Sequence, residues 1–67
     1  MVTEFYEVYS LEHGDEIVVC GNIYKIVDIE TLNDDSTSLL LIDENGYAKT
    51  LNANDYDKIR VICPEFS

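Results

Sequence analysis

The stretch EIVVCGNIYKIVDIE, residues 16–30, carries the strongest structural signal in this chain of 67 residues. Two runs rich in Ile, Val and Tyr flank Gly21-Asn22, and such residues suit the pleated surface of a half-buried strand. A two-residue connection of this kind tolerates the positive φ that tight hairpin turns require. The stretch therefore predicts a β-hairpin that joins Glu16–Cys20 to Ile23–Glu30.

The second strand of this hairpin changes its spacing part-way along. Tyr24 and Ile26 are two residues apart, whereas the next inward candidate, Ile29, follows after three. This step indicates one extra residue in the strand, so we expect a β-bulge or a sharp bend near Val27-Asp28. A bend at this point would let a short sheet curl toward a barrel.

A second hairpin is predicted in the middle of the chain. Ser38–Asp43 and Tyr47–Leu51 are separated by Glu44-Asn45-Gly46, where Gly46 can supply the left-handed residue of a three-residue loop. Turn signals recur at short intervals along the rest of the sequence, and no segment keeps a helical period over ten or more positions. The pattern is typical of a small all-β barrel or sandwich.

The C-terminal part of the chain predicts the closing strand. Asn and Asp residues between positions 52 and 58 favour one turn of 3₁₀ helix, with Tyr56 folded onto the end of the barrel. Ile59–Cys63 then forms the last strand, and Pro64 ends it because proline lacks the N–H that a continuing ladder needs. We assign Tyr24 and Tyr56 to the core.

The N-terminal stretch leaves three alternatives open. Thr3–Leu11 interleaves aromatic residues with Glu, so it adds an edge strand, covers the mouth of the barrel or is only loosely attached. We expect a single domain over residues 1–67, with the barrel at about residues 14–63 and an N-terminal edge strand or arm over residues 1–13. The predicted fold is a barrel of about five antiparallel strands.

The chain resembles an SH3-like barrel at four places: Gly14-Asp15-Glu16-Ile17, Tyr24-Lys25-Ile26, Asn45-Gly46 and Asn54-Asp55-Tyr56. The resemblance concerns the fold, and it implies five strands with a 3₁₀ turn before the last one. Peptide-binding SH3 domains also carry a groove tryptophan, and this sequence contains no Trp. The resemblance therefore does not extend to proline-rich ligands. In size and charge the chain is also similar to small phage or prophage accessory proteins.

The charge balance restricts the partners. Fourteen Asp and Glu against four Lys and Arg give a formal net charge of −10. Such a chain repels phosphate backbones and anionic head groups, which argues against direct contact with nucleic acid or membranes. Glu4 and Glu7 lie where an export signal would need basic residues, and no apolar run approaches roughly 18 residues, so we expect a cytoplasmic protein.

The residues that carry chemistry are few. His13 has no further ligands at the tight spacing of a zinc site, and neither Cys20 nor Cys63 has a basic neighbour in the sequence that would favour a reactive thiolate. If the strands Glu16–Cys20 and Ile59–Cys63 pair in register, Cys20 falls opposite Ile59 and Cys63 opposite Glu16. This pairing would hold the two sulfurs roughly 13 Å apart, so we expect reduced thiols. Oxygen ligands gather in residues 33–36 and 43–45, but solvated turns are the favoured interpretation over a Ca²⁺ or Mg²⁺ site. We expect no enzyme, metal or cofactor.

Carboxylates and tyrosines are the better functional candidates. Residues 28–46 hold six acids and no Lys or Arg, and five Tyr are many for so small a chain. Tyr is favoured at interfaces because it offers a large area with a polar tip. The sequence predicts an interaction module for a basic protein surface. The predicted contact residues are Glu4, Tyr6, Glu7, Tyr9, Asp34, Asp35, Asp43, Glu44 and Tyr47.

Three other hypotheses remain open. Rows of carboxylates about 6.8 Å apart along a strand roughly imitate the charge density of DNA, so the protein would inhibit a nucleic-acid enzyme as a DNA mimic. Alternatively, the chain is a structural component of an assembly such as a viral particle. A bare edge strand would also allow a homodimer.

Overall fold

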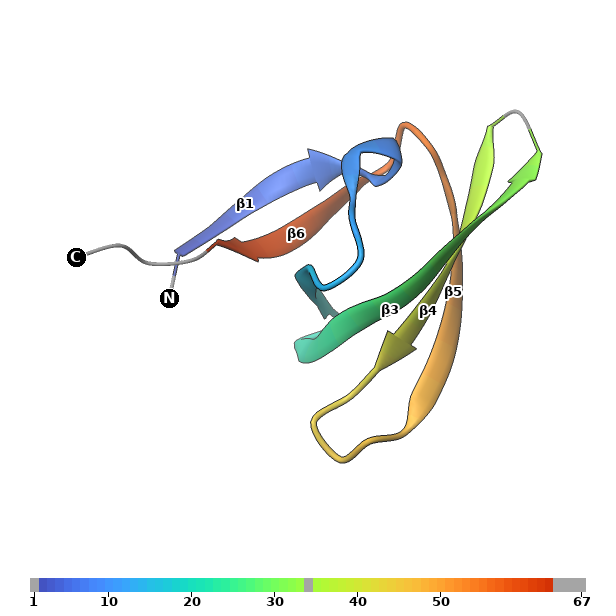
Figure 1. Cartoon of the computed structure of the whole chain (residues 1–67). Coiled ribbons are helices and arrows are strands. Elements are labelled where there is room, and N and C mark those ends of the chain that lie inside the picture. The colour runs from blue at the N-terminus through green and yellow to red at the C-terminus, as the bar shows by residue number, and fades with distance from the viewer. Residues whose placement is uncertain (1, 34, 64–67) are drawn as a thin grey trace.

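The computed structural model describes residues 2–33 and 35–63, which form one open, antiparallel, six-stranded sheet (Figure 1). The strand order is β1-β6-β2-β3-β4-β5. The elements are β1 (Val2–Glu7), the 3₁₀ helix η1 (Val8–Ser10), β2 (Glu16–Val19), β3 (Asn22–Asn33), β4 (Ser36–Ile42), β5 (Ala48–Asn54) and β6 (Lys58–Cys63). The all-β prediction is confirmed, but the described sheet has six strands and does not close.

The first predicted hairpin is present, with its turn one residue earlier than expected. Cys20 and Gly21 form the two-residue connection and have positive φ angles of 51° and 80°. This register places Ile17 opposite Tyr24 and Glu16 opposite Lys25. The apolar pair and the opposite-charge pair favour the observed register, although the turn puts a non-glycine residue in the left-handed region.

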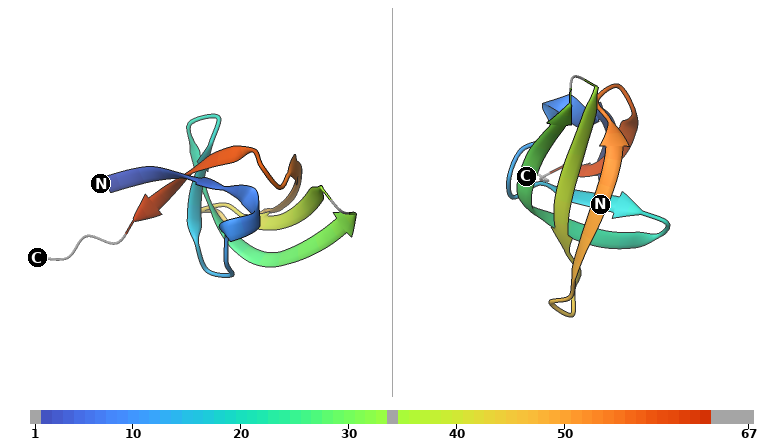
Figure 2. Two further views of the ribbon diagram at one scale, coloured as in Figure 1. Left: turned by 90° about the horizontal axis from the view of Figure 1, so that it is seen from above. Right: turned by 90° about the vertical axis from the view of Figure 1, so that its right-hand side faces the viewer.

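β3 is long because two hairpins share it. Its first part, Asn22–Lys25, pairs with β2, and the part from Lys25 to Asn33 pairs with β4. The register shifts between Ile26 and Asp28, so the predicted bulge is confirmed. A second shift, between Thr31 and Asn33, was not predicted. Both views of Figure 2 show the sheet strongly curled, as bulged strands allow.

The second hairpin follows the prediction closely. β4 and β5 pair from Ile42 opposite Ala48 to Ser36 opposite Asn54. Asp43 organises the loop, because its carboxylate accepts hydrogen bonds of 2.9 Å from the N–H groups of Asn45 and Tyr47. Gly46 has a φ of 89°, the left-handed conformation that the loop requires.

The N-terminal stretch is an edge strand, one of its three predicted alternatives. β1 pairs with β6 along its whole length, from Val2 opposite Cys63 to Glu7 opposite Lys58. β6 also pairs with β2, where Glu16 lies opposite Ile62; the expected pairing of Glu16 with Cys63 is wrong by one residue. Cys20 and Cys63 are free cysteines.

The connection between β5 and β6 differs from the prediction. β5 continues to Asn54, and the chain reverses in a turn closed by a 3.0 Å hydrogen bond from the Asp57 N–H to the Asn54 carbonyl. No 3₁₀ helix forms there, and the 3₁₀ helix of the described chain is η1. The turn projects Tyr56 outward with 71% of its surface exposed, so its assignment to the core is wrong.

The core fills the concave face of the curled sheet. Tyr24, the other predicted core tyrosine, packs against it and is partly buried. Since a domain of this size has little apolar area to bury, its stability depends strongly on the few apolar side chains of this core. The buried apolar side chains are Val8, Leu11, Ile17, Ile26, Leu39, Leu41 and Val61.

Candidate functional site

Three segments distant in sequence meet at one end of the molecule. In η1, the N–H of Val8 donates to the carbonyl of Asp57 at 2.9 Å, and that of Tyr9 donates to Asp55 at 3.1 Å. The N–H of Asp55 in turn donates to the carbonyl of Asp35, in the β3–β4 turn, at 2.8 Å. Figure 2 shows η1 and both turns at the same end. We call this surface the acidic end; it comprises Glu7, Tyr9, Asp35, Asp55, Tyr56 and Asp57.

Two exposed tyrosines lie among these carboxylates. The rings of Tyr9 and Tyr56 are 6.0 Å apart between centroids and meet edge-to-face at 65°. Their exposed fractions are 60% and 71%. Edge-to-face packing lets each ring support the other while most of both surfaces remains accessible. The pair therefore offers a preorganised aromatic contact surrounded by negative charge.

Two carboxylates of the acidic end also maintain its structure. The hydroxyl of Thr37, a buried side chain of β4, donates a short hydrogen bond to Asp55 Oδ1. Asp57 Oδ2 accepts the N–H of Asn54 at 3.3 Å, across the turn. Asp35 is exposed, and its carboxylate accepts no hydrogen bond from the described residues. The end thus combines carboxylates that hold the turn with carboxylates directed to solvent.

The predicted contact residues do not form one site. Glu7, Tyr9 and Asp35 come together at the acidic end, and Asp34 lies outside the described residues. Asp43, Glu44 and Tyr47 occupy the β4–β5 loop at the opposite end of the curled sheet (Figure 1). Glu4 and Tyr6 lie on β1 and belong to neither end.

Glu4 and Tyr6 instead interact with one another. The Tyr6 hydroxyl donates to Glu4 Oε2 at 2.7 Å, and Cys63 Sγ lies 3.9 Å from the Tyr6 hydroxyl oxygen. The carboxylate acceptor, with a smaller effect of the thiol, raises the pKa of Tyr6 to about 12. This pair is better explained as a contact along the edge strand than as part of the acidic end.

Sequence reasoning missed Asp55, Tyr56 and Asp57 as contact residues. The predicted 3₁₀ turn would fold Tyr56 onto the core, whereas the observed turn exposes it. The acidic, Asn-rich composition of residues 52–57 was the available signal, since such residues favour exposed turns. What the sequence did not reveal is that η1 docks onto this turn and completes the acidic end.

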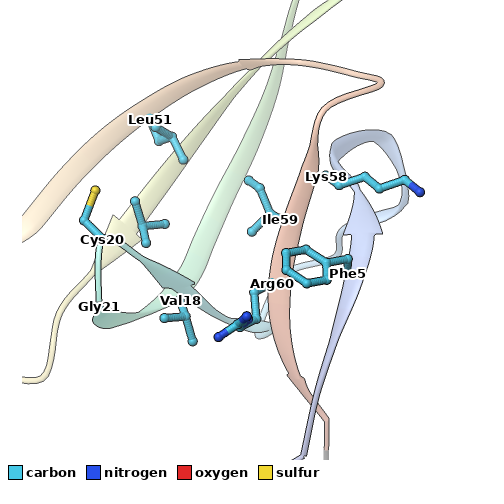
Figure 3. Close-up of a pocket in the computed structure, with 9 residues that line it drawn as sticks. Phe5, Val18, Cys20, Gly21, Leu51, Lys58, Ile59 and Arg60 are labelled. Atoms are coloured by element: carbon cyan, nitrogen blue, oxygen red, sulfur yellow. The ribbon is translucent and has the colours of Figure 1, made fainter.

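A groove of about 410 Å³ lies between β5 and β6 (Figure 3). Leu51 from β5 and Ile59 from β6 point toward each other across it, and Val18 and Val19 from β2 add further apolar surface. We call it the β5–β6 groove; its lining residues are Phe5, Val18, Val19, Cys20, Gly21, Leu51, Lys58, Ile59 and Arg60.

The charge of the β5–β6 groove is opposite to that of the chain as a whole. Two of the four basic side chains, Lys58 and Arg60, line it, and its described lining contains no Asp or Glu. The Arg60 guanidinium lies 5.1 Å from the centroid of the Phe5 ring, a cation–π contact that holds the cation beside the groove. Figure 3 shows the end of Lys58 directed toward β1, so Arg60 is the principal cation.

His13 takes part in an exposed contact away from both surfaces. Its Nε2 is 3.6 Å from Asp28 Oδ1, and both side chains are 65% exposed. Across residues 2–33 and 35–63, no three His, Cys, Asp or Glu side chains are grouped so that they could hold a metal ion. The most distinctive chemistry of the described chain therefore lies in the acidic end and the groove.

Comparison with known proteins assigns no relationship. No family model matches the sequence, and no curated protein matches it significantly. In the described part of the chain, no helix has the length and apolar character needed to cross a membrane. The functional argument therefore depends on the two surfaces themselves.

Proposed function

We propose that this protein is a non-enzymatic interaction module whose acidic end binds a basic surface of another protein. The observation that carries the proposal is the set of backbone hydrogen bonds joining η1, the β3–β4 turn and the β5–β6 turn. These bonds gather four carboxylates and an exposed tyrosine pair from three separate segments. A basic partner would meet a charged surface that is already organised.

Charge and aromatic area have different roles in this proposal. The net charge of −10 attracts a cationic partner over a distance and accelerates association, an effect that weakens as salt is added. Tyr9 and Tyr56 supply area that becomes buried on contact, and this contribution depends little on salt. Specific binding thus requires both the carboxylates and the two rings.

We also propose that the fold is an open form of the SH3-like barrel. The support is the bent β3, shared by two hairpins, and the return of β6 beside β2. In this interpretation the gap between β5 and β6 is the place where the barrel remains open.

The direct test is affinity capture with a matched pair of triple variants. The first variant neutralises the acidic end with Glu7→Gln, Asp35→Asn and Asp57→Asn. The control removes the same charge elsewhere with Glu12→Gln, Glu16→Gln and Glu44→Gln, at three exposed positions. We expect the wild type and the control to retain a basic partner that the first variant loses.

The outcomes of this test separate the hypotheses. Equal loss by both variants, or by neither, would contradict a role for the acidic end. A captured nucleic-acid enzyme that duplex DNA displaces would replace the general module with a DNA mimic. Retention of a partner at high salt together with loss in a Tyr9→Ala, Tyr56→Ala variant would locate the salt-resistant part of the contact on the ring pair.

A further inference from the structure

β5 presents a free strand edge to the β5–β6 groove. Its seven residues pair with β4 on one side, and no described strand pairs with its other side. β6 pairs with β2 from Arg60 to Ile62, and no strand among residues 2–33 and 35–63 lies beside Lys58 and Ile59 on that side. Unpaired N–H and C=O groups of an edge strand are ready to accept a further strand. The groove therefore has hydrogen-bonding capacity along its length.

The floor of the groove is apolar. Leu51 lies opposite the buried Leu39 on β4 and is itself only partly buried, so it extends the core to the open side of the sheet. Ile59 packs against the same core from β6. A ligand that fills the space between these two side chains would bury apolar surface that is now partly exposed to solvent, which favours binding.

We propose that the β5–β6 groove binds an extended acidic peptide of another protein, added as a strand to the free edge of β5. Because side chains alternate along a strand, one set would contact Leu51 and Ile59. The other set would bring a carboxylate to Arg60, which can hold it with two parallel hydrogen bonds. This inference is independent of the acidic end, which binds the opposite charge.

Charge complementarity selects this occupant. A basic peptide would place its cations beside Arg60 and Lys58, and the described lining offers it no carboxylate. A second copy of the chain would bring another net charge of −10 against the first, so self-association is disfavoured. An acidic, partly apolar strand from a different protein matches both the apolar floor of the groove and the Arg60 guanidinium.

The sign of the peptide charge provides a sharp test. We would titrate the protein into labelled octapeptides of alternating Val and Glu or alternating Val and Lys, and follow fluorescence anisotropy at moderate salt. Net charge alone predicts tighter binding of the Lys peptide. Because a Lys peptide can also bind the acidic end, amide shifts at Leu51, Ile59 and Arg60 report the groove alone. The proposal predicts that the Glu peptide binds there at least about tenfold more tightly than the Lys peptide, since like charges in contact are disfavoured.

Matched variants separate the groove from the overall charge. Arg60→Gln should weaken binding of the Glu peptide about tenfold or more, because a charged hydrogen bond is lost. Lys25→Gln removes the same charge from a position outside the groove and should leave the affinity unchanged. Neutralising the acidic end should not weaken binding of the Glu peptide. Failure of the proposed function and failure of this inference are therefore distinguishable.

The binding mode has its own readout. Two octapeptides N-methylated at alternate residues, in the two possible phases, test the ladder: the phase that blocks the N–H groups facing β5 should bind at least about tenfold more weakly than the parent, and the other phase should not. Backbone amide shifts on adding the parent peptide should be largest at Leu51, Ile59 and Arg60. Equal binding of Glu and Lys peptides in the groove, or shifts confined to the β4–β5 loop, would overturn the proposal. Sedimentation showing a dimer that excludes the peptide would also overturn it in favour of a second copy.

Discussion

The acidic end and the β5–β6 groove are built from adjoining residues yet have opposite charge. Asp55 and Asp57 belong to the turn that completes the acidic end, and Lys58 and Arg60 begin the strand that borders the groove. Backbone hydrogen bonds organise the first surface, whereas apolar contacts and a free strand edge define the second. The comparison teaches that a net charge of −10 describes the chain but not each of its surfaces.

The difference also separates two kinds of interaction. The acidic end is a completed structure in which turn carbonyls and N–H groups already have partners. The groove is the place where the sheet remains incomplete. A partner of the acidic end would dock on a preformed surface, and a partner of the groove would extend the sheet.

The largest effect should come from breaking the core beneath the groove. Leu39 has no exposed surface and lies opposite Leu51, so Leu39→Ala leaves a cavity that should lower the free energy of unfolding by about 2–5 kcal/mol. Denaturant titration measures this change. The exposed neighbour Leu40 provides a matched control, and Leu40→Ala should cost much less. Equal costs at the two positions would contradict the inward and outward faces assigned to β4.

A smaller effect is expected from loosening the acidic end. Thr37→Val removes the hydroxyl that donates to Asp55, leaving that carboxylate without this donor. We expect a loss of about 2 kcal/mol and faster hydrogen exchange at the Asp55 amide. Thr50→Val, at an exposed position of β5, is the control and should change neither quantity. Unchanged hydrogen exchange at the Asp55 amide in the Thr37→Val variant would contradict a stabilising role for the Thr37–Asp55 hydrogen bond.

The rim of the groove depends on a turn that requires positive φ at Gly21. Gly21 has a φ of 80°, and a Cβ there would meet no atom within 4 Å, so Gly21→Ala should cost about 1 kcal/mol through backbone strain alone. Gly46→Ala, at a φ of 89° in the other hairpin, should cost a similar amount. Only the Gly21 change is next to the groove and should alter binding of the Glu peptide. An equal effect of both variants on binding would weaken the assignment of the groove.

The smallest expected effect concerns the edge strand that carries Phe5. Tyr6 should ionise at a pKa of about 12, because its hydroxyl donates to the Glu4 carboxylate. The stabilisation from this raised pKa is complete below about pH 10, the usual tyrosine value, and is lost as the pH rises toward 12. Spectrophotometric titration should show one of the five tyrosines ionising last. Tyr6→Phe should remove that late step, and Glu4→Gln should move it to lower pH.

Local patterns predicted the strands but not how distant segments meet. The spacing of Tyr24, Ile26 and Ile29 was sufficient to predict the bulge, because side-chain alternation is a local property of a strand. The sequence predicts the turn at Gly21-Asn22, one residue later than the observed Cys20-Gly21, because cross-strand pairs and not turn preference determine the register. The docking of η1 on the β5–β6 turn depends on backbone bonds between remote residues, which leave no periodic signal.

The candidate site shows the same limit. Glu7, Tyr9 and Asp35, which are predicted contacts because of their charge or aromatic character, do come together, but Asp43 and Tyr47 lie at the opposite end. Tyr56 was misassigned because burial of an aromatic residue depends on where its turn projects it. The cationic groove was not predicted, since its residues come from β1, β2, β5 and β6 and share no sequence pattern.

The most direct test is a pair of NMR titrations on the intact protein, one with a Lys-rich peptide and one with the alternating Val and Glu peptide. The two-surface account predicts that the Lys-rich peptide shifts the amides of Tyr9, Asp35 and Tyr56, whereas the Glu peptide shifts those of Leu51, Ile59 and Arg60. Perturbation of the same residues by both peptides, or shifts spread evenly over the sheet, would contradict it.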